Sequence, residues 1–105
     1  MPDPVRDAVG KALFYAQVGG KSPAAKPFHG LGGGASVLEV VEDHDGDTYR
    51  AVYTVRFAEV VYVLHAFQKK SKRGSSTPQH DIELIRRRLQ EAEEDYHERY
   101  VRKGG

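Results

Sequence analysis

Two apolar runs stand almost end to end in the middle of the chain, and they constrain its fold more than any other feature. They cover Tyr49–Phe57 and Val60–Gln68 and are rich in Val, Tyr and Phe, residues that β-strands favour. Ala58 and Glu59 separate them, as in a two-residue hairpin turn. The sequence therefore predicts an antiparallel hairpin at the centre of the fold.

The short turn sets the register of this hairpin. With two loop residues, Arg50 lies opposite Phe67 and Val52 lies opposite His65, and facing residues share one face of the sheet. One face is then wholly apolar and is predicted to pack against helices, with Ala51, Tyr53, Val55, Phe57, Val60, Tyr62, Leu64 and Ala66. The other face is mixed, with Arg50, Val52, Thr54, Arg56, Val61, Val63, His65 and Phe67.

Arg50 and His65 are thus expected near each other on the mixed face, which Lys69 continues. A register slip of one residue would replace Lys69 with Lys70 and move His65 to the other face. Each residue also has a simpler interpretation. Arg50 can balance the acidic residues of the neighbouring strand and turn, and His65 can be a hydrogen-bonded structural residue, although histidine also suits proton transfer.

Apolar residues at helical spacing predict a helix on each side of the hairpin. Asp3 can cap a first helix that begins at Pro4 and ends at Gly19 and Gly20. Thr77 can cap a second helix that begins at Pro78, with apolar residues three and four apart at Ile82, Ile85, Leu89, Ala92 and Tyr96.

The segment between the first helix and the hairpin contains two further elements. Residues 21–36 hold two prolines and four glycines, which predict a loop anchored by Phe28 and Leu31 with room for a short helical turn. Val37–Glu42 is predicted to be a strand, followed by an acidic turn over 43–48 that contains the hairpin signal Asp45-Gly46. The expected class is α+β: an antiparallel meander packed against the first helix, with a C-terminal helix.

Composition limits the function classes. With 105 residues and 39% hydrophobic residues, 1–105 can form a single domain around one core. Cys is absent, which excludes disulfides and thiolate chemistry. The histidines other than His65 are not spaced like metal ligands, so no metal or cofactor is expected. The apolar runs are short and no signal peptide precedes them, so we expect a cytoplasmic protein without a membrane segment.

Positive charge is concentrated in one quarter of the chain. Residues 65–90 contain seven Lys and Arg residues against two acidic ones, a net charge of +5, which leaves −4 for the remainder of the chain. Such a local excess suits the binding of nucleic-acid phosphates. A solvated face is the alternative interpretation of the same charges.

Several segments occur in a specific order: YRAVY on one predicted strand, VYVLHAFQKKSK on the next, and then TP at the start of a helix. In this combination they closely resemble type II toxins of the RelE superfamily, specifically the phage-derived, HigB-like branch. The resemblance covers nearly the whole chain, including AQVGGKSP and KPFHGLGGG. It implies a compact α+β toxin domain and, in the free protein, ribosome-dependent cleavage of messenger RNA without a metal.

The resemblance also implies partners and site residues. The partners are messenger RNA in the ribosomal A site and a neutralising helix-turn-helix antitoxin, through which operator DNA is bound. By position, Arg50 matches a strand arginine near the scissile phosphate, and Lys69 and Lys70 match a basic pair at the end of the last strand. His65 is the candidate general base or acid. Lys72 and Arg73 extend the basic segment as candidate RNA-binding residues.

Two departures from the RelE pattern keep other functions open. Relatives carry a short strand before the first helix, whereas this sequence begins almost at the helix, so we expect the outer strand to be absent and the exposed edge to invite dimerisation. The best-known relatives use a C-terminal tyrosine, and the sequence does not decide whether Tyr96 or Tyr100 corresponds to it. A catalytically inactive relative that binds only its antitoxin, or a non-catalytic RNA-binding module, are the alternatives.

Overall fold

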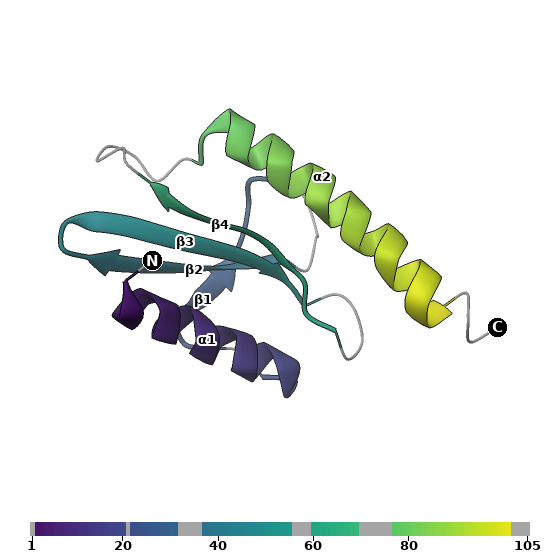
Figure 1. The fold of residues 1–105 in the computed structure, drawn as a ribbon, viewed down its shortest axis with the longest axis horizontal. Coiled ribbons are helices and arrows are strands. Elements are labelled where there is room, and N and C mark those ends of the chain that lie inside the picture. Colours follow the sequence, from purple (N-terminus) through teal and green to yellow (C-terminus); the bar gives the residue numbers. More distant parts are fainter. Residues whose placement is uncertain (1, 21, 32–36, 56–59, 70–76, 102–105) are drawn as a thin grey trace.

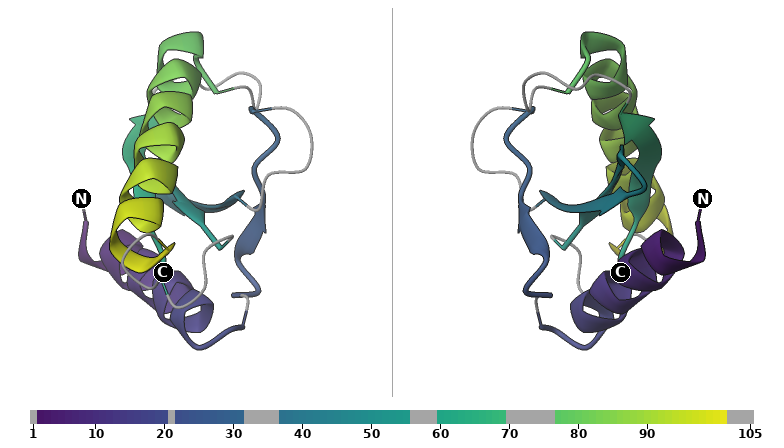
Figure 2. Two further views of the ribbon diagram at one scale, coloured as in Figure 1. Left: turned by 90° about the vertical axis from the view of Figure 1, so that its right-hand side faces the viewer. Right: turned by 90° about the vertical axis from the view of Figure 1, so that its left-hand side faces the viewer.

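A four-stranded antiparallel sheet lies between two helices in the computed structural model, which describes residues 2–20, 22–31, 37–55, 60–69 and 77–101. The strands follow the order β1 (Ala25–Pro27), β2 (Val37–His44), β3 (Asp47–Thr54) and β4 (Val63–Lys69). Helix α1 (Asp3–Gln17) and helix α2 (Gln79–Tyr96) cover opposite faces, and a π-helical turn, His97–Val101, follows α2 (Figures 1 and 2). The predicted α+β class is confirmed.

Each face of the sheet has its own hydrophobic core, because neighbouring residues on a strand point to opposite faces. Tyr53 packs with Ala12 of α1, whereas Val52 packs with Ile85 of α2. The expectation that the helices share one apolar face is therefore wrong. Helix α2 covers the face predicted to be mixed, and we call this the α2 face.

The predicted register is correct over the outer part of the hairpin. Arg50 pairs with Phe67 and Val52 with His65, but the next pair is Tyr53 with Val63, so Leu64 is an extra residue in a β-bulge. The bulge turns Leu64, which is 2% exposed, into the α2 core rather than onto the face predicted for it. The described strands are also shorter than predicted, and the predicted turn residues 58–59 lie outside the described residues.

The Asp45-Gly46 turn is confirmed as the β2–β3 connection. Both residues have positive φ angles, 51° and 83°, which a two-residue type I′ hairpin requires and which Gly and Asp tolerate best. His44 and Asp47 form the last strand pair, so the turn is tighter than the predicted 43–48 segment.

The segment predicted as a loop supplies an edge strand. Ala25–Pro27 pairs antiparallel with β2, and the backbone N–H of Phe28 donates a hydrogen bond of 2.9 Å to the carbonyl of Val37. A three-residue strand ending in proline has no alternation to detect, although proline is compatible with an edge. Phe28 is buried and Leu31 packs on the same core, so both predicted anchors are confirmed. The edge next to β2 is thus occupied by β1.

Each helix begins one residue away from its predicted start. Helix α1 begins at Asp3, one residue earlier than predicted, and α2 begins at Gln79, one residue later. Neither start has a side-chain cap hydrogen bond. Proline precedes both helices because its fixed φ angle suits this position. None of the described helices is long and apolar enough to cross a membrane.

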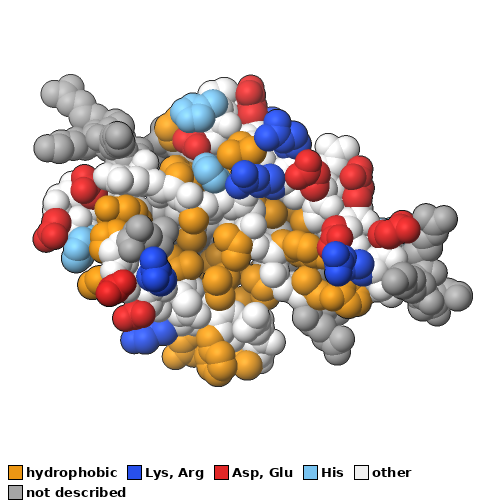
Figure 3. Space-filling view, viewed as in Figure 1, with side chains coloured by type: hydrophobic (Ala, Val, Ile, Leu, Met, Phe, Trp, Pro, Cys, Tyr) orange, Lys and Arg blue, Asp and Glu red, His pale blue; other side chains and the backbone are white. Residues whose placement is uncertain are grey.

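At the other edge, β4 has no strand beside it in the described sheet. Val63 on this strand is 50% exposed, and Figure 3 shows apolar side chains gathered between the two helices on this side of the molecule. An open edge of this kind can pair with another chain.

The far end of α2 is tied to the residues that lead into β4. The Tyr62 hydroxyl donates a hydrogen bond of 2.6 Å to Asp95 Oδ2, and Arg99 Nε donates one of 2.8 Å to Asp95 Oδ1. Burial, followed by the hydrogen bond to Asp95, raises the pKa of Tyr62 to about 12. The same hydrogen bonds from Tyr62 and Arg99 lower the pKa of Asp95.

Tyr62→Phe is expected to lower the melting temperature below pH 10. Because the pKa of Tyr62 rises from its ordinary value of 10.0 to about 12 in the fold, its contribution is complete below pH 10 and is lost between pH 10 and 12. Thermal unfolding from pH 8 to 12 should show the two proteins converging over this window. Burial also raises the pKa of Tyr53. Because Tyr53 is present in both proteins, its effect on stability cancels when their melting temperatures are compared. A difference that is constant with pH would contradict this account.

Candidate active site

A cleft of about 420 Å³ opens on the α2 face, beside strands β1, β2 and β3. The segment that follows β1 forms one wall, and Thr77, just before α2, and Ile82, in its first turn, also line the cleft. The residues that line the cleft are Lys26, Pro27, Phe28, His29, Gly30, Glu39, Arg50, Thr77 and Ile82. Arg50, the strand arginine singled out from the sequence, therefore lies in a cavity of ligand size.

Three charged residues from adjacent strands form the floor of this cleft. Lys26 pairs with Glu39 across β1 and β2, and Glu39 lies opposite Val52, two residues from Arg50 on β3. Glu39 Oε2 lies 3.3 Å from Arg50 Nη1, and Glu39 Oε1 lies 3.8 Å from Lys26 Nζ. The carboxylate is thus held between two cations.

Burial makes the Arg50–Glu39 contact more than a surface ion pair. Both residues are 6% exposed, so their charges are largely removed from water and depend on each other. The interpretation of Arg50 as the partner of an acidic residue on the neighbouring strand is correct for Glu39. Lys26 keeps a side chain that is 58% exposed and can reach a ligand in the cleft.

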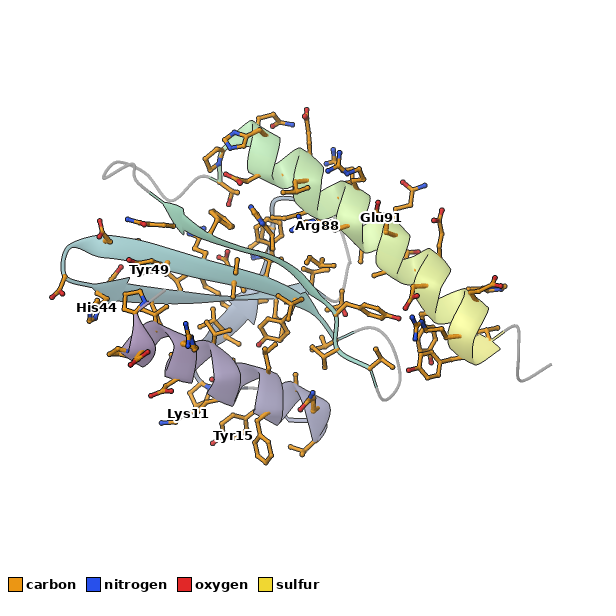
Figure 4. All side chains as sticks on the ribbon, viewed as in Figure 1. Lys11, Tyr15, His44, Tyr49, Arg88 and Glu91 are labelled. Atoms are coloured by element: carbon orange, nitrogen blue, oxygen red, sulfur yellow. The ribbon has the colours of Figure 1, made fainter. Side chains whose placement is uncertain are left out.

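His65 also lies on the α2 face, but it does not line the cleft. Its Nε2 lies 2.8 Å from Asp81 Oδ1, and its Nδ1 lies 3.5 Å from Nη1 of Arg88. Arg88 reaches from α2 toward β4, where it also donates a hydrogen bond of 2.9 Å to the carbonyl of Leu64 in the bulge (Figure 4). Both ring nitrogens of His65 are therefore engaged, as expected of a hydrogen-bonded structural histidine.

Phe67 is a neighbour of both predicted site residues. It lies opposite Arg50 across the β3–β4 pair, and its ring stacks on His65 with the ring centroids 4.7 Å apart. Arg50 and His65 share a face as predicted, but Arg50 lines the cleft and His65 does not. The cleft and the His65–Asp81 pair are two neighbouring sites rather than one.

The predicted basic residues of the 69–73 segment are described only in part. Lys69 ends β4 with its backbone paired to Thr48, which selects the unslipped register. Lys70, Lys72 and Arg73 lie outside the described residues. Their proposed roles in catalysis and RNA binding stay predictions.

Sequence analysis missed two polar residues of the cleft, Lys26 and His29, and it considered Glu39 only as one possible charge partner of Arg50. Lys26 and His29 flank Phe28, and burial of that ring beneath the α2 face brings both to the cleft. The segment KPFH, in which two polar residues surround one anchored aromatic residue, was the available signal. In the described part of the chain, no group of three His, Asp or Glu side chains is placed to hold a metal ion.

Comparison with known proteins identifies the family of the chain that carries this cleft. A family model described as "phage derived protein Gp49-like" matches residues 1–90, which include α1, the whole sheet and most of α2. The chain belongs to the phage-derived Gp49-like family. The Gp49-like family is a RelE-like toxin family, so the broad toxin assignment stands. No curated protein and no solved structure matches the chain.

Proposed function

We propose that this Gp49-like protein is the toxin of a type II toxin–antitoxin system, of the HigB-like branch, and that it cleaves messenger RNA in the ribosomal A site. The observation that carries the proposal is the position of Arg50, a buried arginine at the floor of an open cleft in a RelE-like toxin family. The exposed ammonium group of Lys26 adds a second cation beside it.

The chemistry fits these side chains. In metal-free cleavage, the 2′-hydroxyl group attacks the adjacent phosphate, and negative charge builds up on the non-bridging oxygens in the transition state. Preorganised cations stabilise that charge in a site with little water. Arg50 and Lys26 supply them from the cleft, and Lys69 and Lys70 are proposed to add charge from the end of β4. Lys72 and Arg73 are proposed to hold the RNA backbone.

The proposed partners follow from the same function. A helix-turn-helix antitoxin neutralises the toxin in the cytoplasm, and the pair binds operator DNA through the antitoxin. The open edge of β4, with its half-exposed Val63, supports a homodimer as a further proposal. The proposed active unit is the single domain 1–105.

A second candidate function is a catalytically inactive relative that binds only its antitoxin. Two contacts favour it: Glu39 offsets the charge of Arg50, and His65 uses both ring nitrogens within the fold. The inactive relative and the ribonuclease differ in whether the free protein cleaves messages.

Induced expression in a bacterium without the antitoxin distinguishes them. The wild-type chain is expected to arrest growth and to produce cleaved messages on translating ribosomes. Arg50→Lys keeps the positive charge beside Glu39 but loses the planar guanidinium fork, so cleavage should fall by about 10²-fold or more. Arg87→Lys, the same change at an exposed position of α2, is the matched control and should cleave like the wild type.

Two results would count against the ribonuclease, and a third would count against the role of Arg50. Intact growth and intact messages with retained antitoxin binding would establish the inactive relative. Salt-dependent RNA affinity without cleavage, unchanged in Arg50→Ala, His65→Ala, would indicate an RNA-binding module. Full cleavage by Arg50→Lys would remove Arg50 from the site.

A further inference from the structure

The cleft contains the side chains for binding phosphate, and one further residue that can move a proton. Its ionisable residues are Lys26, His29, Glu39 and Arg50. Ammonium and guanidinium groups are hydrogen-bond donors without an acceptor atom, so Lys26 and Arg50 are suited to binding phosphate rather than to accepting a proton. Glu39 has a cation at each carboxylate oxygen, with Lys26 at Oε1 and Arg50 at Oε2.

His29 is the histidine that lines the cleft, and its surroundings differ from those of three other histidines. His44, His65 and His80 each have a ring nitrogen within 3.4 Å of an aspartate oxygen, at Asp45 or Asp81. His29 is exposed at the cleft, and its backbone is fixed because the preceding residue, Phe28, is buried and hydrogen-bonded to Val37. A solvent-accessible imidazole on a fixed backbone suits proton transfer with a ligand in the cleft.

We propose that His29 is the general base of the reaction and accepts the proton of the attacking 2′-hydroxyl group, an inference that rests on the ribonuclease function. The exposed ammonium group of Lys26 gives a proton to the leaving oxygen. The roles follow from position and chemical type, because both side chains line the cleft, an imidazole nitrogen offers a lone pair and an ammonium group offers a proton. His65 then supports the fold through Asp81 and Arg88.

The step balances in atoms and charge. An imidazole nitrogen of His29 takes the proton of the 2′-hydroxyl group while the 2′-oxygen forms a bond to phosphorus. The bond from phosphorus to the 5′-oxygen breaks, and that oxygen takes a proton from the Lys26 ammonium group. The products are a 2′,3′-cyclic phosphate and a 5′-hydroxyl end. Water then returns the proton from the His29 imidazolium ion to the Lys26 amine.

A sulfur substitution separates the base from the acid. After the bond cleaved by the wild-type protein on programmed ribosomes is mapped, the same message is made with sulfur in place of the bridging 5′-oxygen. A thiolate leaves without protonation, so Lys26→Ala should lose activity on the oxygen substrate and regain on the sulfur substrate the part of the loss that is due to the missing acid. His29→Ala should lose about 10²–10⁴-fold on both substrates, because the attacking hydroxyl group still needs a base.

Controls and contrary results are equally specific. His29→Gln should repeat the loss, added imidazole should restore part of the activity of His29→Ala, and His97→Ala, at another exposed histidine, should match the wild type. Wild-type cleavage rates in both His29 variants would overturn the inference and leave the ribonuclease standing. Rescue of His29→Ala by sulfur would also overturn it, since His29 would then be the acid. A wild-type protein that cleaves nothing would overturn both proposals.

Discussion

Glu39→Gln is expected to destabilise the folded protein by about 3–5 kcal/mol, the usual cost of removing one partner from a buried ion pair. Glu39 and Arg50 are both 6% exposed and their charged atoms lie 3.3 Å apart. Loss of the carboxylate leaves two cations, Arg50 and Lys26, beside each other on the α2 face. Domains of this size have about 5–15 kcal/mol of stability, so much of it would be lost. Urea unfolding followed by circular dichroism measures the change.

A double variant identifies the cause. Glu39→Gln combined with Arg50→Gln removes both charges and should recover most of the loss, because two neutral amides need no counter-charge. Glu83→Gln, the same change at an exposed position of α2, should lie within about 0.5 kcal/mol of the wild type. A loss below about 1 kcal/mol for the single change would mean that water screens the pair as it does at a surface.

Ile85→Ala is expected to cost about 2–5 kcal/mol and to loosen α2 from the sheet. Ile85 is 0% exposed and packs with Val52 and Leu64 in the core beneath α2. Truncation to alanine removes buried methyl and methylene groups from the centre of this contact. Because Ile82, one turn earlier, lines the cleft, amide hydrogen exchange should rise in α2 and in the cleft wall before it rises in α1.

The control for this change lies on the same helix. Arg87 is exposed, and Arg87→Ala should leave both the unfolding free energy and the exchange pattern within error of the wild type. Equal exchange in α1 and α2 after Ile85→Ala would show that the two cores unfold as one unit, contrary to this expectation.

Local sequence signals predicted the elements that depend on neighbours in the chain. Alternation along β3 and β4, together with the Asp45-Gly46 pair, located the strands, and the predicted pairing of Arg50 with Phe67 is correct although the register shifts at Leu64. The bulge at Leu64 could not be predicted this way. It is favoured by burial of Leu64 against α2, a contact between residues more than 20 positions apart.

The residues of the cleft were also only partly predictable, because the cleft depends on contacts between distant parts of the chain. Arg50 was identified from its unusual place in an apolar strand, and its lining of the cleft agrees with that choice. Lys26 and His29 reach the cleft through β1, whose three residues pair with β2 although they carry no strand pattern. His65 was chosen for its chemistry and for its predicted place near Arg50 on the mixed face, whereas its contacts with Asp81 and Arg88 depend on where α2 docks.

The Glu39–Arg50 pair has a consequence for selectivity between stages of the proposed reaction. A phosphodiester carries one negative charge, whereas the pentacoordinate phosphorane carries two. An arginine already offset by a carboxylate attracts the singly charged backbone of bulk RNA weakly, and it gains most when the second charge appears. Such a site binds the transition state more tightly than it binds unreacted RNA. The toxin would then bind most cellular RNA only weakly and would dissociate from it.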